Sequence, residues 1–305
     1  MTLKWYLGIS SFCLSIVVIF LNIIIFVPVF RLAFILRKST AYIIAFFNII
    51  TDLMQAGVLG FYLSTSMMTD QYLLAGSRHS FINVFLGGFF LNGWFMECLV
   101  QIVMAVNRFT VITLNEHYIF TSNTTLIIFF FLTTTTVFSV VCTQYLFPCC
   151  KIPKLIPKVV ITMLFINIKG LYSYSNLMLV SYDIVCTTSS ICYIAVFSLF
   201  EILRKMWRVI LIDLIRTASK RFVLISIFYV LAWVLFEILP FIVPADQPQW
   251  YAVIPFFTLN CSSNAIIYLS LNRETQKSVR TSWLMSKISP PKASSLIHSI
   301  PATTN

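Results

Sequence analysis

The chain is 305 residues long, and 59% of them are hydrophobic while only 10% are charged. Soluble domains use about 25% charged residues, so this composition, with a mean hydropathy of +0.91, excludes an ordinary water-soluble protein. The net charge of +11 would suggest nucleic acid as a partner of a soluble protein. In a membrane protein the same excess suits cytoplasmic loops and anionic headgroups. We therefore expect membrane lipid, and no nucleic acid, as a partner.

Seven apolar stretches follow one another along the chain. A membrane-spanning helix needs about 20 apolar residues to cross a hydrocarbon core about 30 Å thick. By that measure the sequence predicts spans at about residues 7–30, 41–67, 81–106, 125–147, 176–203, 222–243 and 251–271. A short basic helix is expected next, at 272–284. The predicted fold class is an all-α membrane protein, a seven-transmembrane helix bundle in one domain (residues 1–288), with a disordered cytoplasmic tail at 289–305.

The distribution of basic residues predicts the orientation of this bundle. With the N-terminus outside and the C-terminus inside, 15 of the 21 lysines and arginines lie in the inner loops and tail. That is the bias expected of cytoplasmic segments, although the long outer loop carries four lysines against it. One apolar stretch at 159–168 is too short to span and is assigned to that loop. If it did span, the count would be eight and both termini would share a side.

Four acidic residues fall inside predicted spans, where a charged group costs about 2.5–3.5 kcal/mol on insertion scales. Glu97 lies about 16 Å along its helix from Arg108, near mid-membrane, and Asp52 lies at a similar depth. Amide side chains on neighbouring spans are expected at the same level, and two of them share a face at i and i+4. The predicted buried polar cluster consists of Asn22, Asp52, Glu97, Asn260, Asn264 and Tyr268.

Two interpretations of this cluster remain open. Two carboxylates in one site cannot both stay ionised without a cation, so Asp52 and Glu97 indicate a sodium- or proton-sensitive site. Alternatively, the acids are neutral and form a hydrogen-bonded knot between helices, with about 0.6 kcal/mol per bond. No other metal site is expected.

Ligand contacts are sought in the outer halves of the spans. Asp183 and Glu237 would either face an outer cavity or pair with loop lysines such as Lys169. Phe90 and Trp94 belong to an aromatic stretch in the third span. Such a cavity, apolar with few polar anchors, suits a small apolar molecule. Nothing in it is suited to gripping an amine or a phosphate.

The expected inner face is basic. Asn107 and Arg108 end the third span, and Arg108 is either a contact for neighbouring helix ends or a snorkelling arginine at the boundary. Between spans five and six, Arg204 and Lys220 belong to one basic stripe of an amphipathic helix. That stripe would dock either a partner protein or anionic lipid.

Several of these positions together resemble the rhodopsin-like receptors. The resemblance rests on Asn22, Asp52, the triplet at 107–109, the motif at 264–268 and the basic short helix after it. The stretch at 117–122 after Asn-Arg-Phe is similar, more specifically, to the nematode serpentine chemoreceptors of class X. Departures include Ala265 in place of a proline and Asn83 in place of a cysteine.

The resemblance implies a G-protein-coupled receptor in the plasma membrane, and a small-molecule cue detected by a sensory neuron, as in olfaction, at its cilium. It implies coupling to a heterotrimeric G protein through Arg108, and a sodium pocket lined by Asp52 and Asn264. Rival functions are a neuropeptide or other ligand receptor of the same fold and a secondary transporter, which would show inverted repeats. No H-E-x-x-H or G-x-G-D motif occurs, so we expect neither an enzyme nor a cofactor.

Overall fold

The computed structural model describes residues 3–69, 81–110, 120–143 and 251–285, with a few single positions between 181 and 231. Most of the predicted spans five and six, and the predicted tail at 289–305, lie outside the described residues. Four apolar helices in the described part are long enough to cross a membrane, and the α8–α9 pair adds a fifth if it is counted as one bent span.

The first span is longer than expected at both ends. Helix α1 covers Leu3–Phe30 and continues as a π-helical segment, η1, over Arg31–Ile35. Pro28, which removes a backbone donor from a helix interior, lies just before this change of helix type. Arg37 has a φ of 45°, a left-handed conformation that few non-glycine residues adopt. The chain turns there into the second span.

The second span is a composite of three helical segments. It consists of α2 (Thr40–Gly57), the π-helical η2 (Val58–Ser64) and α3 (Thr65–Thr69). Ser39 caps the first of them, its Oγ accepting a hydrogen bond from the Ala41 amide at 3.3 Å, as is usual for a serine N-cap. In η2 the Ser64 hydroxyl donates to the Leu59 carbonyl, five residues earlier, at 2.7 Å.

The remaining described helices agree with the predicted spans to within a few residues. These are α4 (Phe81–Phe109), α5 (Ser122–Val141), α8 (Val253–Leu271) and α9 (Arg273–Met285). Thr121 caps α5 through a hydrogen bond from the Thr124 amide. Pro255 stands in the first turn of α8, where its missing N–H has no helical partner to lose. The helix axes of α8 and α9 differ in direction by 86°.

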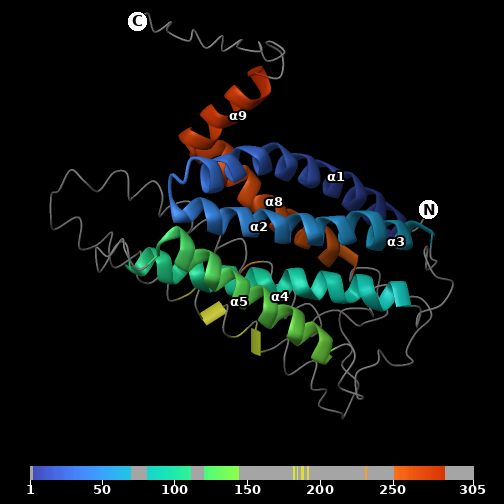
Figure 1. The fold of residues 1–305 in the computed structure, drawn as a ribbon. Helices are drawn as coiled ribbons and strands as arrows, with labels where there is room; N and C mark the ends of the chain where they lie inside the picture. Colours follow the sequence, from blue (N-terminus) through green and yellow to red (C-terminus); the bar gives the residue numbers. More distant parts are fainter. Residues whose placement is uncertain are drawn as a thin grey trace, which may run out of the picture.

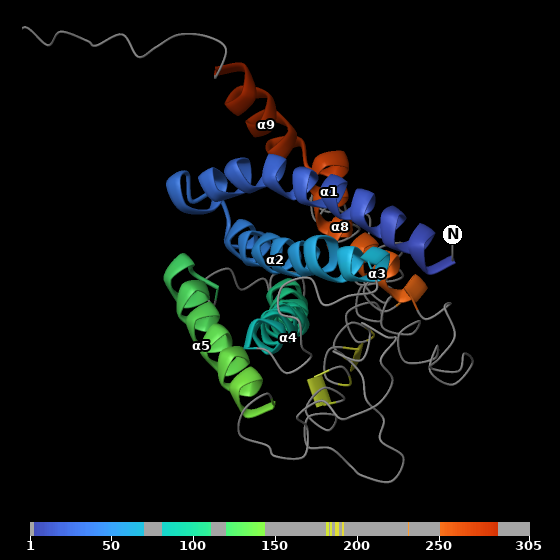
Figure 2. The same cartoon turned by 90° about the vertical axis from the view of Figure 1, so that its right-hand side faces the viewer.

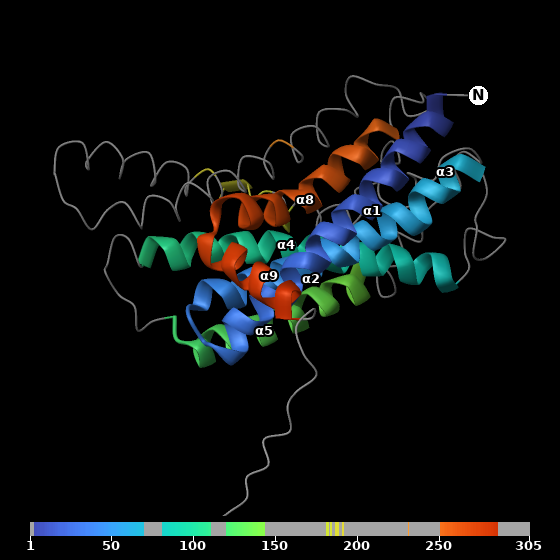
Figure 3. The ribbon, with the colours of Figure 1, turned by 90° about the horizontal axis from the view of Figure 1, so that it is seen from above.

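The described helices form a bundle in which successive spans run in opposite directions (Figure 1). Helix α2 lies between α1 and α4, and α5 packs against α4 and α2 (Figure 2). Helix α8 runs alongside α1 and contacts α2, and α9 turns away from its end (Figure 3). The start of α1 and the end of α8 lie at opposite ends of the bundle. The chain therefore crosses it an odd number of times.

Apolar side chains fill the space between these helices and also cover their outward faces. One buried cluster includes Leu59, Trp94 and Phe257, and another, nearer the α9 end, includes Ile25 and Ile49. Large apolar side chains such as Phe20 and Phe130 are exposed on α1 and α5. Such a surface is suited to contact with hydrocarbon, which matches the predicted membrane environment.

Candidate functional site

Glu97, on α4, is 1% exposed and connects two other helices. Its Oε2 accepts a hydrogen bond from the Gln55 Nε2 of α2 at 2.8 Å. Its Oε1 accepts one from the Asn260 Nδ2 of α8, also at 2.8 Å. Both carboxylate oxygens are thus bonded to amide donors, and α2, α4 and α8 meet at this one side chain.

Asp52, on α2, is 0% exposed and makes a similar contact one helical turn along α8. Its Oδ2 accepts a hydrogen bond from the Asn264 Nδ2 at 2.9 Å. Because Asn260 and Asn264 are four residues apart, they lie on the same face of α8. The two acids are therefore bonded to successive turns of the same helix.

Asn22 connects α1 to the same stretch of α8. Its Nδ2 donates to the Val18 carbonyl at 3.0 Å and to the Cys261 carbonyl at 3.1 Å. It bonds the backbone of α8 and not the acids themselves. We call Asn22, Asp52, Gln55, Glu97, Asn260 and Asn264 the polar cluster. It joins α1, α2, α4 and α8 in the interior of the bundle.

Gln55 is the member of the polar cluster that the sequence analysis missed. It lies three residues after Asp52, so the two share a face of α2, and that spacing was the available signal. Gly93 of α4 makes room for it, since a Cβ on that glycine would lie 2.9 Å from the Gln55 Cγ. A larger residue at position 93 would have to displace the Gln55 side chain.

Several buried oxygens of the polar cluster accept no hydrogen bond from any described residue. They are the Asp52 Oδ1, the Asn264 Oδ1, the Gln55 Oε1 and the Asn22 Oδ1. Neither acid forms an ion pair within the described part of the chain. Carboxylate and amide oxygens are the ligands that hard cations prefer, and an uncompensated buried carboxylate favours a proton or a cation. These residues therefore fit a small cation such as sodium.

Tyr268, which was expected in the cluster, lies one turn beyond Asn264 on α8. Its ring packs among apolar residues of α1, α2 and α8 that include Ile25, Ile49 and Ala265. With this apolar packing, Tyr268 stands at the edge of the polar cluster.

The aromatic residues predicted for a ligand pocket are packed against one another. Phe90 and Trp94 of α4 are both buried, and their rings lie 6.2 Å and 4.9 Å from the Phe257 ring of α8. Tyr182, which the sequence analysis passed over, stacks on Phe95 with ring centroids 4.3 Å apart and bonds the Ser139 hydroxyl at 2.9 Å. The predicted contacts at Asp183 and Glu237 lie outside the described residues.

At the other end of the bundle, α9 is tied to the start of α2. The Tyr42 hydroxyl donates to the Glu274 Oε2 at 2.7 Å. Asn272 caps α9, its Oδ1 accepting from the amides of Glu274 and Thr275 at 3.1 Å and 3.2 Å. The Gln276 Nε2 donates to the Leu269 carbonyl at 2.7 Å, so the end of α8 is capped from α9.

Two of the four residues predicted to couple to a partner lie in the described part of the chain. Asn107 is buried in the last turn of α4, and Arg108 follows it one residue before the helix ends. Nothing is described of the Arg108 side chain. Arg204 and Lys220 lie outside the described residues.

The arrangement of helices has a counterpart among solved structures. The chain is similar to squid rhodopsin, with a TM-score of 0.59, over 95% of this chain and 88% of that one, at 12% sequence identity. The chain has the rhodopsin fold. The prediction of an all-α, seven-transmembrane helix bundle is thereby confirmed. No protein-family profile matches the sequence, and no curated protein does. The likeness in fold agrees with the resemblance to rhodopsin-like receptors that the sequence motifs indicated.

Proposed function

We propose that this chain is a G-protein-coupled chemosensory receptor that detects a small, apolar or weakly polar external molecule and activates a heterotrimeric G protein. The observation that carries the proposal is the rhodopsin fold over 95% of the chain. A fold alone does not define a function, so the proposal also draws on the polar cluster. That cluster holds four helices together, as a receptor that switches between two helix packings requires.

The polar cluster is proposed as the ion-sensitive part of the receptor. Asp52 and Glu97 are buried, and their hydrogen-bond partners among the described residues are all amide groups. Oxygens of Asp52 and Asn264 accept no hydrogen bond within that part of the chain. Sodium bound there would compensate the buried negative charge. Because it would bind the present packing of α2, α4 and α8, it would favour that packing over one in which these helices separate.

We assign G-protein contacts to the cytoplasmic end of the bundle and ligand contacts to its outer end. Asn107, Arg108, Arg204 and Lys220 are proposed to contact the G protein on the cytoplasmic side. Phe90, Trp94, Asp183 and Glu237 are proposed as ligand contacts near the outer side. The assignment to nematode class X chemoreceptors, and to the plasma membrane of a sensory cilium, rests on the motif at 107–109 and the stretch at 117–122.

The proposal is tested by nucleotide exchange in liposomes that hold the purified full chain and a heterotrimeric G protein. We expect exchange above that of empty liposomes, and a loss of about fivefold or more with Arg108→Ala, the lower end of typical coupling. Arg31→Ala, in η1, removes a basic residue elsewhere and should leave the rate unchanged. Sodium, compared with choline at equal ionic strength, should lower the basal rate. That response should disappear in Asp52→Asn.

Each outcome bears on a separate part of the proposal. No exchange with any class of G protein, alone or with a panel of small apolar compounds, would contradict the receptor. An equal sodium response in the wild type and in Asp52→Asn would contradict the ion site and leave the receptor intact. Saturable activation by a peptide, and not by small apolar compounds, would instead favour a neuropeptide receptor of the same fold.

A further inference from the structure

Asn48, on α2, is 1% exposed, and neither its amide nitrogen nor its carbonyl oxygen has a hydrogen-bond partner among the described residues. It lies one helical turn from Asp52, on the same face of α2 and toward the α9 end. Gln101 lies one turn from Glu97 on α4, also toward that end, and its buried Nε2 has no acceptor in the described part of the chain. A buried amide left without a partner is costly, so these two side chains call for a partner that is neither helix nor side chain.

Unpaired donors and unpaired acceptors occur at neighbouring levels of the bundle. The amide nitrogens of Asn48 and Gln101 are the donors. The Asp52 Oδ1 and the Asn264 Oδ1, which belong to the polar cluster, are acceptors without a donor in the described part of the chain. A buried water molecule makes about three hydrogen bonds to such groups. A short chain of ordered water would therefore satisfy all four residues.

Hydrogen-bonding groups continue from there to the α9 end. Tyr268 of α8 is buried in one cluster with Ala45, a small residue of α2. At the start of α2 the Tyr42 hydroxyl accepts a hydrogen bond from the Asn272 Nδ2 at 3.3 Å and donates one to the Glu274 Oε2 at 2.7 Å. Polar side chains thus lie along α2 and α8 from the polar cluster to the start of α9. We call this set the polar column: Asn48, Gln101, Tyr268, Tyr42, Asn272 and Glu274.

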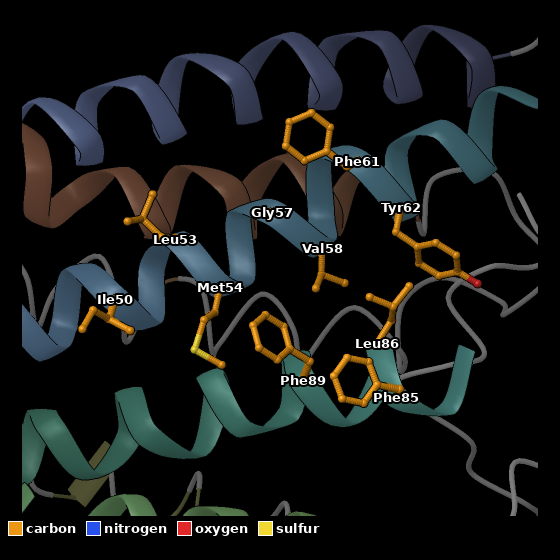
Figure 4. A pocket seen from close by; sticks show the side chains of 10 residues that line it. All are labelled: Ile50, Leu53, Met54, Gly57, Val58, Phe61, Tyr62, Phe85, Leu86 and Phe89. Atoms are coloured by element: carbon orange, nitrogen blue, oxygen red, sulfur yellow. The ribbon is translucent and has the colours of Figure 1, made fainter. Parts of the chain in front are cut away.

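Within the described part of the chain, the other directions out of the polar cluster are apolar. Away from α9, the rings of Phe90 and Trp94 pack against the Phe257 ring at 6.2 Å and 4.9 Å. Toward the lipid, the side of α2 opposite Asp52 lines a groove whose walls include Met54 and Phe89 (Figure 4). Water is poorly bound between such surfaces, because it finds few polar partners there. Water beside the acids therefore connects most readily to the α9 end.

Few other titratable groups lie near the two acids. Among the described side chains, no lysine, arginine or histidine is buried. The buried groups of α4 and α8 are the thiols of Cys98 and Cys261 and the phenol of Tyr268, and groups of these kinds are ordinarily neutral below about pH 8. Helix α5 has no titratable side chain, and those of α1 lie toward its start. Acidity therefore acts here on the carboxyl groups.

We propose that ordered water in the polar column carries protons between the α9 end of the bundle and the pair formed by Asp52 and Glu97. Each transfer breaks one O–H bond and forms another on the next oxygen, and the last leaves the proton on a carboxylate of the pair. Asn48 and Gln101 are positioning residues, because their amides orient the water and do not carry the proton. The inference rests on the ion site proposed above, since a proton on Asp52 neutralises the charge that sodium would compensate. Acidity at the α9 end, the predicted cytoplasmic end, thus competes with sodium.

The test follows hydrogen–deuterium exchange of the protonated carboxyl groups by infrared spectroscopy. The purified full chain is held in nanodiscs at mildly acid pH, with choline in place of sodium, and is transferred to deuterated buffer. Differences from Asp52→Asn and Glu97→Gln assign the carboxyl band to the pair. We expect wild-type exchange to finish well before the backbone amides of α2 and α4 exchange. Asn48→Leu should slow it by about tenfold or more, the scale of one buried hydrogen bond lost from the path.

Asn92→Leu is the matched control, because it makes the same change at an amide whose Oδ1 is also buried without a described partner. Asn92 lies on a different side of α4 from Glu97, away from the polar column, so this variant should exchange as the wild type does.

Three results would overturn the proposal. They are equal exchange in the wild type and Asn48→Leu, wild-type exchange as slow as that of the backbone amides, and the absence of a protonated band from either acid. Should Asn48→Leu fail to fold, Gln101→Leu applies the same test, and unchanged exchange in that variant counts equally against the column. The assay contains neither sodium nor G protein, so its failure is distinguishable from failure of the sodium response or of receptor activity.

Discussion

At the scale of single residues, Glu97 and Asp52 show how carboxyl groups are accommodated within a membrane bundle. Neither has a basic partner among the described residues, and amide donors from neighbouring helices supply the hydrogen bonds instead. Removing one partner of a buried pair costs more than the pair itself contributes, because the remaining group stays desolvated. The consequence can be measured at Glu97, which accepts two such bonds.

We predict that Glu97→Leu lowers the free energy of unfolding by about 1–3 kcal/mol, because the Gln55 and Asn260 amides lose their acceptor. Glu97→Gln should cost about 0.6 kcal/mol or less, the average for one membrane hydrogen bond. It keeps one acceptor oxygen, and Gln55 can turn its amide because its Oε1 has no described partner. Thermal unfolding in nanodiscs distinguishes the two variants. Equal losses would mean that the stabilisation requires the ionised carboxylate.

The sequence predicted part of this site. Depth along the helices and the i, i+4 spacing predicted that Asp52, Glu97, Asn260 and Asn264 lie near one another, and in the structure Asn264 bonds Asp52 and Asn260 bonds Glu97. Depth cannot say which amide faces which acid, because that depends on the rotation of each helix about its axis. Gln55 was missed for a related reason, since an uncharged amide in an apolar span attracts less notice than an acid.

At the scale of elements, the junction of α8 and α9 is fixed by side chains from three segments. Asn272 caps α9, Gln276 caps the end of α8, and Tyr42 at the start of α2 bonds Glu274. An 86° change of direction cannot be maintained by helical hydrogen bonds, so these contacts, together with the packing of α9 against α1, determine where α9 points. Among them, the bond from Tyr42 is the one that reaches another span.

Tyr42→Phe is therefore expected to loosen α9 without unfolding the bundle. The hydrogen bond to Glu274 is lost, and a bond to a charged group contributes about 1.5–3 kcal/mol. The hydrogen bond that the Asn272 Nδ2 donates to the Tyr42 hydroxyl at 3.3 Å is lost with it. Hydrogen exchange of residues 273–285 should become faster, while exchange in α1 and α4 stays the same. Tyr6→Phe, at an exposed tyrosine of α1, serves as the control. Unchanged exchange in α9 would show that the two caps alone fix its direction.

Helix boundaries were predictable to within a few residues, but helix type was not. Hydropathy marks where a span begins and ends, and η1 and η2 are themselves largely apolar. A π-helical segment depends on backbone hydrogen bonds to the residue five positions earlier. The Leu36 amide donates such a bond to the Arg31 carbonyl at 2.9 Å, yet neither residue type favours a π-helix over an α-helix.

At the scale of the whole molecule, the positions of the chain ends indicate an odd number of spans. The start of α1 and the end of α8 lie at opposite ends of the bundle (Figure 1), so the alternative with eight spans and both termini on one side is disfavoured. The distribution of lysines and arginines predicts which end of the bundle faces the cytoplasm, because cytoplasmic segments tend to be basic.

We predict that a glycosylation reporter is modified at the N-terminus and in the connection near Gly76, and is unmodified at the C-terminus. The reason is the placement of 15 of the 21 basic residues on the inner side. Mobility shift after enzymatic removal of glycan provides the measurement. Modification at the C-terminus alone would show the reverse orientation. Modification at both termini would imply an even number of spans and would favour a secondary transporter.

The fold was predictable at this scale because seven apolar segments leave few alternatives to a helix bundle. The likeness to squid rhodopsin was less accessible from sequence, because the identity is only 12%. Many different apolar residues can retain the same packing of helices.

The amides of α8 belong to a longer series, Phe256, Asn260, Asn264 and Tyr268, with one member on each turn. A slip of α8 by one turn, about 5.4 Å, toward the α9 end would bring Phe256 level with Glu97, and that acid would keep only the hydrogen bond from Gln55 of α2. A slip the other way would bring Asn264 level with Glu97 and Tyr268 level with Asp52, so both acids would again meet a donor. The two directions of sliding are therefore not equivalent, because only a slip away from the α9 end places another donor of α8 beside Glu97.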